Sequence, residues 1–198
     1  KIAPVQVAIV PIFNNDQERS ETLNFSESLA NLLKEKIDSL QIKIDNSDKQ
    51  RPADKFFHWI QQGVPIRIEV GPRDVKKQSA IVARRDIREK NSVPVSQITQ
   101  YVVDLLEKIQ NNLFERALNY RTENSYTVSS YDEFKEIINN QGGFISAHWD
   151  GSREVEAQIK NETKATIRCL PIEKNPEPGK CVVSGRPSSQ RAIFAIAY

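Results

Sequence analysis

Aromatic residues and arginines come close together in one stretch of this 198-residue chain, and their chemistry suits the binding of RNA. Phe56, Phe57 and Trp59 precede a β-branched run that carries Arg67, and Arg73–Asp74 follows that run. Aromatic rings stack on splayed RNA bases, while arginine and aspartate form hydrogen bonds with base edges. A structural explanation stays open here, in which the aromatic residues belong to the core and the charges face solvent.

The distribution of charge agrees with a polyanionic partner. Residues 51–90 hold ten Lys and Arg and five acids, a local charge of +5, although the whole chain has a net charge of only +2. Residues 98–198 hold 12 basic and 13 acidic residues. A basic segment joined to a near-neutral one is a weak sign of nucleic-acid binding, because charge runs also serve simply to solvate a surface.

Familiar catalytic motifs are missing from the sequence. It has no hydrolase elbow, P-loop or Gly-rich dinucleotide turn, so we expect no catalytic residue in it. His148 has no accompanying nucleophile motif and is better explained as a structural histidine. No apolar run approaches the ~18 residues of a spanning helix, and the start is not a signal peptide. We therefore expect no membrane association and a cytoplasmic location.

Cys169 and Cys181 flank a Pro-rich turn at residues 173–179. Two thiolates across a hairpin could supply half of a four-ligand zinc site. The chain has no other cysteine and only two histidines, His58 and His148, so the other half is missing. We expect idle thiols and no bound metal.

The elements that must position these residues follow from hydrophobic periodicity. A helix is expected to start after a cap at Asn24 or Ser26, and Gly71–Pro72 reads as a turn. Another helix starts at Pro52 and ends at Gly63. Strands are expected at residues 5–12, 41–45, 65–70, 80–85 and 92–95. The result is an α/β, mixed-sheet domain over residues 1–97.

An apolar stripe from Ile98 to Tyr120 predicts a long connecting helix, which we assign to residues 98–125. Beyond it, residues 126–198 read as a small α+β domain. Its helices are expected at residues 131–138 and 152–163, and its strands at residues 144–149, 165–170 and 191–198.

Several motifs, in this order, resemble prolyl-tRNA synthetase of the archaeal/eukaryote-like type, a class II aminoacyl-tRNA synthetase. Residues 55–59 (KFFHW), 63–74 (GVPIRIEVGPRD) and 82–86 (VARRD) resemble its anticodon-binding domain. Residues 131–135 (YDEFK), 147–151 (AHWDG), 163–169 (TKATIRC) and 194–198 (FAIAY) resemble its extra C-terminal domain. The resemblance implies a C-terminal fragment of a proline–tRNA ligase that lacks the catalytic domain and is inactive alone.

The resemblance also implies partners and site residues. The partners would be proline tRNA and the missing catalytic domain, within a homodimer. ATP and Mg²⁺ would serve the full-length enzyme, with no cofactor in this fragment. Phe56 would stack on an anticodon base, Arg67, Arg73 and Asp74 would meet guanines or nearby backbone, and Lys90 would contact a phosphate.

In two places the chain differs from the family's pattern. Ile60 stands where the family commonly has an acid, so one base contact is expected to be missing. Cys169 and Cys181 match only two of the four zinc-binding cysteines that many members carry, which again predicts that zinc has been lost. Two other classes stay as alternatives: a non-catalytic protein-interaction module and, ranked last, an editing hydrolase.

Overall fold

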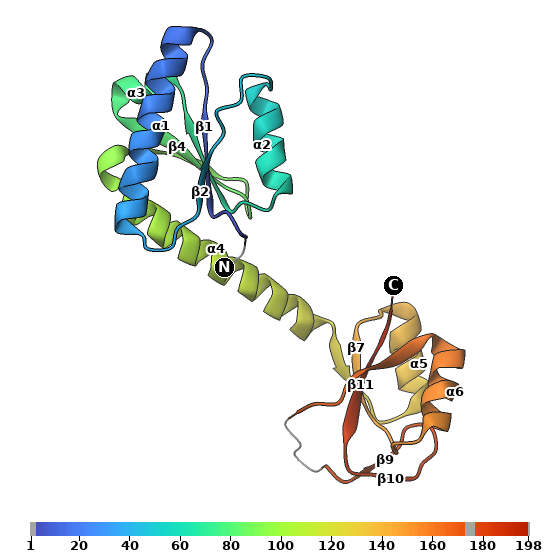
Figure 1. Ribbon diagram of the computed structural model, residues 1–198. Coiled ribbons are helices and arrows are strands. Elements are labelled where there is room, and N and C mark those ends of the chain that lie inside the picture. The colour runs from blue at the N-terminus through green and yellow to red at the C-terminus, as the bar shows by residue number, and fades with distance from the viewer. Residues whose placement is uncertain (1–2, 173–176, 198) are drawn as a thin grey trace. The chain divides into compact units, whose positions relative to one another are not determined.

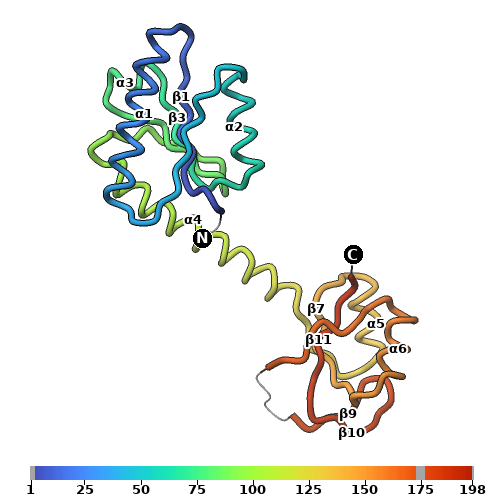
Figure 2. The backbone as a smooth tube through the Cα atoms, in the orientation of Figure 1, coloured from blue at the N-terminus to red at the C-terminus, as the bar shows by residue number. Residues whose placement is uncertain are grey.

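The computed structural model describes residues 3–172 and 177–197. The chain divides into two compact units, Lys1–Glu115 and Arg116–Tyr198, which are described separately below. The end of the last expected strand, Tyr198, and residues 173–176 of the expected turn lie outside the described residues. Figures 1 and 2 follow the chain through both units.

The N-terminal unit is built on a five-stranded mixed sheet of order β2-β1-β3-β4-β5. Strand β1 pairs in parallel with β2 and β3, whereas β4 and β5 are antiparallel to their neighbours. One row of residues directly opposite one another across four strands contains Ala8, Arg67, Ala83 and Lys90. The strands span Val7–Pro11 (β1), Ile42–Ile44 (β2), Ile66–Val70 (β3), Ser79–Arg84 (β4) and Lys90–Pro94 (β5).

Alternation along β3 separates the two faces of this sheet. One face of β3 packs into the core with side chains of α1 and α4, and it carries Ile66, Ile68 and Val70. The other face carries Arg67 and Glu69. Helix α2 lies on the opposite side of the sheet from α1 (Figures 1 and 2). The helices span Asp16–Lys36 (α1), Pro52–Gln61 (α2), Pro72–Lys77 (α3) and Val95–Glu123 (α4).

Two local predictions in this unit were wrong. Helix α1 begins at Asp16 instead of after Asn24 or Ser26, because Asn15 caps it by accepting a hydrogen bond from the Glu18 N–H at 2.9 Å. The buried hydroxyl of Ser26 bonds back to the Thr22 carbonyl at 2.7 Å, so a cap-type residue lies inside the helix.

The expected turn at Gly71–Pro72 is instead the start of helix α3. Pro72 occupies the first helical position, and the Asp74 carboxylate accepts a hydrogen bond from the Gly71 N–H at 2.9 Å. Strand β3 therefore ends at Val70, and Arg73–Asp74 belongs to a helix that packs against α1 and β4.

The C-terminal unit has a four-stranded sheet of order β6-β7-β11-β8 and a two-stranded hairpin, β9–β10. Phe134 and Phe194 meet edge to face in its core, with ring centroids 5.4 Å apart. The predicted α/β class, mixed sheet, long helix and smaller α+β region are confirmed. The elements are β6 (Ser125–Thr127), α5 (Tyr131–Asn140), β7 (Phe144–His148), α6 (Arg153–Thr163), β8 (Ala165–Cys169), β9 (Gly179–Lys180), β10 (Pro187–Ser188) and β11 (Arg191–Ile196).

Candidate nucleic-acid interface

Phe56, Arg67, Glu69 and Lys90 meet on the face of the N-terminal sheet that α2 partly covers, and we call them the aromatic–basic cluster. The Arg67 guanidinium carbon lies 4.3 Å from the centroid of the Phe56 ring, and the Lys90 ammonium lies 5.1 Å from it. Both distances are within the range of cation–π attraction. The structure thus brings together three of the five residues predicted for the site.

Glu69 links the two cations of this cluster. Its Oε1 accepts hydrogen bonds from Arg67 Nε at 3.1 Å and Nη2 at 2.8 Å, and it lies 2.8 Å from Lys90 Nζ. The carboxylate is nearly buried, whereas the Lys90 side chain is 48% exposed. Two positive groups therefore share one negative group, and the cluster keeps positive charge that faces solvent.

The strand register explains why these residues meet. Arg67 on β3 lies opposite Ala83 on β4, and Ala83 lies opposite Lys90 on β5. Side chains directly opposite one another share one face of the sheet, with Cβ atoms about 5 Å apart. Because Ala83 is small, the long side chains of Arg67 and Lys90 can approach each other above it.

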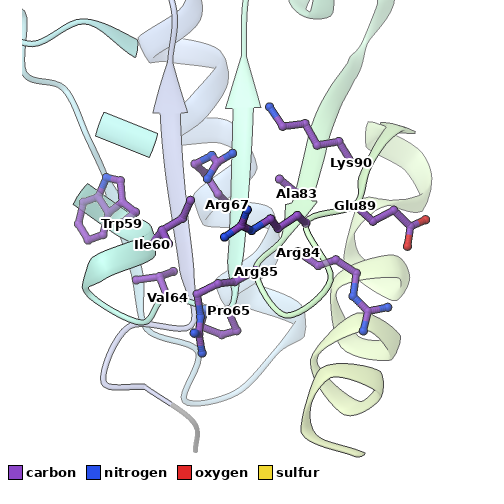
Figure 3. A pocket seen from close by; sticks show the side chains of 11 residues that line it. Trp59, Ile60, Val64, Pro65, Arg67, Ala83, Arg84, Arg85, Glu89 and Lys90 are labelled. Atoms are coloured by element: carbon purple, nitrogen blue, oxygen red, sulfur yellow. The ribbon is translucent and has the colours of Figure 1, made fainter. Parts of the chain in front are cut away.

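A pocket of about 200 Å³ lies beside this cluster, between the end of α2 and strands β3–β5 (Figure 3). Its wall combines apolar side chains with five basic residues and one acidic residue, a composition that suits a base attached to phosphate. The lining residues are Trp59, Ile60, Val64, Pro65, Arg67, Ala83, Arg84, Arg85, Arg88, Glu89 and Lys90.

Arg84 is paired with both oxygens of one carboxylate, whereas Arg67 and Lys90 share a single oxygen of Glu69. Arg84 Nε and Nη2 donate to the two oxygens of Asp86 at 2.8 and 2.6 Å, and Asn112 on α4 donates to Asp86 at 2.7 Å. The hydrogen bond from Arg84 is the main reason that the pKa of Asp86 is lowered. Figure 3 shows Arg84 directed toward a helix and away from Arg67. Arg84 therefore fastens the β4–β5 connection to α4.

Arg73 and Asp74 lie apart from the aromatic–basic cluster, on α3. Asp74 uses one oxygen to cap that helix, and Arg73 is exposed. Among residues 3–172 and 177–197 no hydrogen bond or ion pair joins either residue to Phe56, Arg67 or Lys90. Their roles as RNA contacts stay predictions.

Sequence reasoning did not propose Arg85 or Arg88 as site residues, although both line the pocket at the turn between β4 and β5. Ile60, the position at which the family commonly has an acid, also lines the pocket, next to Trp59 on α2. The signal for Arg85 was present, since it stands beside Arg84 at the end of a β-branched run. Only the pairing of β3 with β4 shows that this end of the run adjoins Pro65, whose carbonyl accepts from the Arg85 N–H at 3.0 Å.

The C-terminal unit offers no comparable open site at His148. The imidazole is 5% exposed, its Nδ1 lies 3.3 Å from Ser188 Oγ, and its Nε2 lies 3.6 Å from a Glu177 oxygen. Ser188 Oγ donates to backbone carbonyls instead of standing free as a nucleophile. A side chain at Gly179 would collide with the imidazole, so only glycine fits over that ring.

Cys169 is exposed and Cys181 buried, and both are free thiols. Within the described ranges, no three His, Cys, Asp or Glu side chains gather as a metal site. Every helix within residues 3–172 and 177–197 is too short or too polar to cross a membrane.

Comparison with known proteins identifies both parts of the chain. The family model described as "Anticodon binding domain" matches residues 6–105, and "Prolyl-tRNA synthetase, C-terminal" matches residues 131–198. Curated relatives named proline–tRNA ligase include that of Porphyromonas gingivalis strain ATCC 33277, 46% identical over 198 residues. That of Phocaeicola vulgatus is 48% identical over 200 residues. Each alignment covers 100% of this chain and 40% of the relative, so the chain spans about two fifths of their length. The chain therefore belongs to the prolyl-tRNA synthetase family and matches its anticodon-binding and C-terminal domains.

Proposed function

We propose that this chain recognises the anticodon of proline tRNA through the aromatic–basic cluster and the pocket beside it. Proline codons begin with CC, so their anticodons carry two guanines. Guanine presents O6 and N7 as adjacent acceptors, and arginine is the side chain that pairs with them most often. The observation that carries the proposal is the Phe56 ring held 4.3 Å from the Arg67 guanidinium carbon inside an anticodon-binding domain.

The hydrogen bonds of Arg67 leave it able to bind a base. A guanidinium has five N–H groups, and Glu69 takes one from Nε and one from Nη2. The edge formed by Nη1 and Nη2 keeps two parallel N–H groups for a guanine. Glu69 therefore orients Arg67 without using up its donors, and Lys90 adds positive charge for a phosphate.

In the longer protein, we propose that this recognition serves an ATP-dependent ligase that attaches proline to its tRNA. The sequence contains no Gly-rich phosphate loop and none of the three class II motifs. We therefore assign ATP, Mg²⁺ and proline to the catalytic domain of that ligase. A homodimer and a cytoplasmic location belong to the same proposal. The 198-residue chain alone should catalyse no proline-dependent pyrophosphate exchange above a buffer blank.

Binding of the purified chain to two RNAs tests the proposal. One is proline tRNA, and the other is the same tRNA with both anticodon guanines changed to cytosine. We expect tighter binding to the first, with affinity that falls steeply as salt is raised. Equal affinity for the two RNAs would show that the chain does not recognise the anticodon. An affinity that does not change with salt would favour the protein-interaction module instead.

A further inference from the structure

Helix α2, which carries Phe56, is attached to its sheet by polar contacts. Lys55 is the only buried residue among the ten of this helix, all of which the structure describes, and its side chain is 3% exposed. Its Nζ donates to the Asp45 carbonyl at 3.2 Å and lies 3.7 Å from Asp45 Oδ1. Trp59 Nε1 donates to Asp45 Oδ2 at 2.9 Å. Asp45 is thus the common partner of two α2 side chains.

Asp45 is itself fixed to the sheet. Its backbone N–H donates to the Ile9 carbonyl at 2.9 Å, which continues the parallel pairing of β2 with β1 beyond Ile44. Its carboxylate is 9% exposed, and Oδ1 also accepts from the Ser47 N–H at 3.3 Å. Because Asp45 is held by the strand, its carboxylate is a fixed point against which α2 is oriented.

The spacing along α2 connects this fixed point to the RNA-binding residues. Lys55 and Trp59 are four residues apart and share one face of the helix, while Phe56 and Ile60 form the next stripe, about 100° around the axis. Side-chain tips lie about 5–6 Å from a helix axis, so a rotation of about 20° would shift them by about 2 Å. That shift is large beside the 4.3 Å between the Phe56 centroid and the Arg67 guanidinium carbon.

We propose that Asp45 is a positioning residue for nucleotide binding, acting through Lys55 and Trp59 to hold Phe56 beside Arg67 and Lys90. The inference rests on the proposed function. A buried ion pair contributes little net stability compared with apolar packing, but it requires a defined geometry. Here that geometry sets the rotation of a helix that has little apolar burial of its own.

The test uses two variants that break this anchor without changing any residue that lines the pocket. Asp45→Asn removes the negative charge, and Lys55→Met removes the cation while keeping an apolar stem. Both variants should bind proline tRNA about tenfold more weakly. A tenfold loss lies in the lower part of the range of affinity that is lost when one base no longer stacks. Asp48→Asn is the matched control, because it removes the same charge three residues away, where the carboxylate is 56% exposed and 3.7 Å from Arg19. The control should bind as the unmodified chain does.

A second background separates positioning from stability. In chains that carry Phe56→Ala, Asp45→Asn and Lys55→Met should cost less than about twofold further, because the residue through which they act is gone. Melting temperatures should fall by the same amount with or without Phe56. An equal loss of RNA affinity in both backgrounds, or no loss in either, would overturn the inference. Failure of the unmodified chain to prefer proline tRNA would instead show that the proposed function is wrong.

Discussion

Two cations of the N-terminal unit share one carboxylate oxygen, whereas an arginine of the C-terminal unit binds both oxygens of one carboxylate. In the first unit, Arg67 and Lys90 both contact Glu69. In the second, Arg191 forms a bidentate pair with Glu177, in which Nε donates to Oε2 at 2.9 Å and Nη2 donates to Oε1 at 3.0 Å. Its Nη1 also donates to two backbone carbonyls. Arg67 therefore keeps N–H donors for a ligand, while the hydrogen bonds of Arg191 all go to groups of its own unit.

Asp150 is the clearest example in the C-terminal unit of a charged side chain whose hydrogen bonds stabilise its own fold. Its carboxylate accepts three hydrogen bonds: one from the Ser152 N–H at 3.0 Å and one each from the hydroxyls of Ser152 and Ser184 at 2.6 Å. It also lies 3.1 Å from Arg186 Nε. These contacts, led by the hydrogen bond from the Ser152 side chain, lower the pKa of Asp150 to about 2. Charged residues in the two units therefore serve different purposes, according to whether their hydrogen bonds are already satisfied within the fold.

The largest expected effect comes from removing this carboxylate. Asp150→Ala leaves several donors without their acceptor and should lower the free energy of unfolding of the C-terminal unit by about 2–3 kcal/mol. Fluorescence of Trp149, whose Nε1 donates to the Ser152 carbonyl at 3.1 Å, reports the transition in a Trp59→Phe background.

Asp132→Ala is the matched control, because that carboxylate is 96% exposed in a surface pair with Lys135. It should cost less than about 0.5 kcal/mol. Similar losses in the two variants would contradict a special role for Asp150.

Acid should destabilise the C-terminal unit through the same group. Because the pKa of folded Asp150 is lowered from 3.8 to about 2, its contribution is complete above pH 4 and is lost as the pH falls toward 2. The melting temperature followed by Trp149 should therefore drop over that interval. Asp150→Asn should show a shallower drop, and an unchanged profile would mean that this carboxylate contributes no pH-dependent stability.

A smaller effect distinguishes the two possible uses of Asp74. Asp74→Ala removes the cap of α3 and should lower the free energy of unfolding of the N-terminal unit by about 1 kcal/mol. Asp74→Asn keeps an oxygen that can accept from Gly71 and should preserve stability. If Asp74 also meets a guanine, the Asn variant should bind proline tRNA more weakly, in a filter-binding assay, than the unmodified chain. Full affinity in that variant would restrict Asp74 to capping.

Much of the N-terminal fold could be predicted from local patterns, because β-branched runs and Gly or Pro breaks fall close to the observed strand limits. The start of α1 was not predicted correctly, since Ser26 looks like a cap, yet its buried hydroxyl is bonded to the Thr22 carbonyl in the preceding turn. Helix α3 has a start signal in Pro72 and Asp74, but a Gly–Pro pair is equally typical of a turn.

The site was only partly predictable for a different reason. Residue types and the resemblance point to Phe56 and Arg67, and the resemblance adds Lys90. That Arg67 and Lys90 lie together depends on the register of β3, β4 and β5, which joins residues far apart in sequence. The sharing of Glu69 and the anchoring of α2 by Asp45 depend on the same long-range pairing. Local periodicity contains no information about either.

Loss of Arg67 tests the central claim most directly, because that residue is held by the fold and is proposed to read the anticodon. Affinities of the unmodified chain and of Arg67→Ala are measured for proline tRNA and for the tRNA with both anticodon guanines changed. We predict a loss of ~1–3 kcal/mol on proline tRNA and a much smaller loss on the changed tRNA, because the two changes remove the same contact. Equal losses on both RNAs, accompanied by a lower melting temperature, would show that Arg67 only supports the sheet through Glu69.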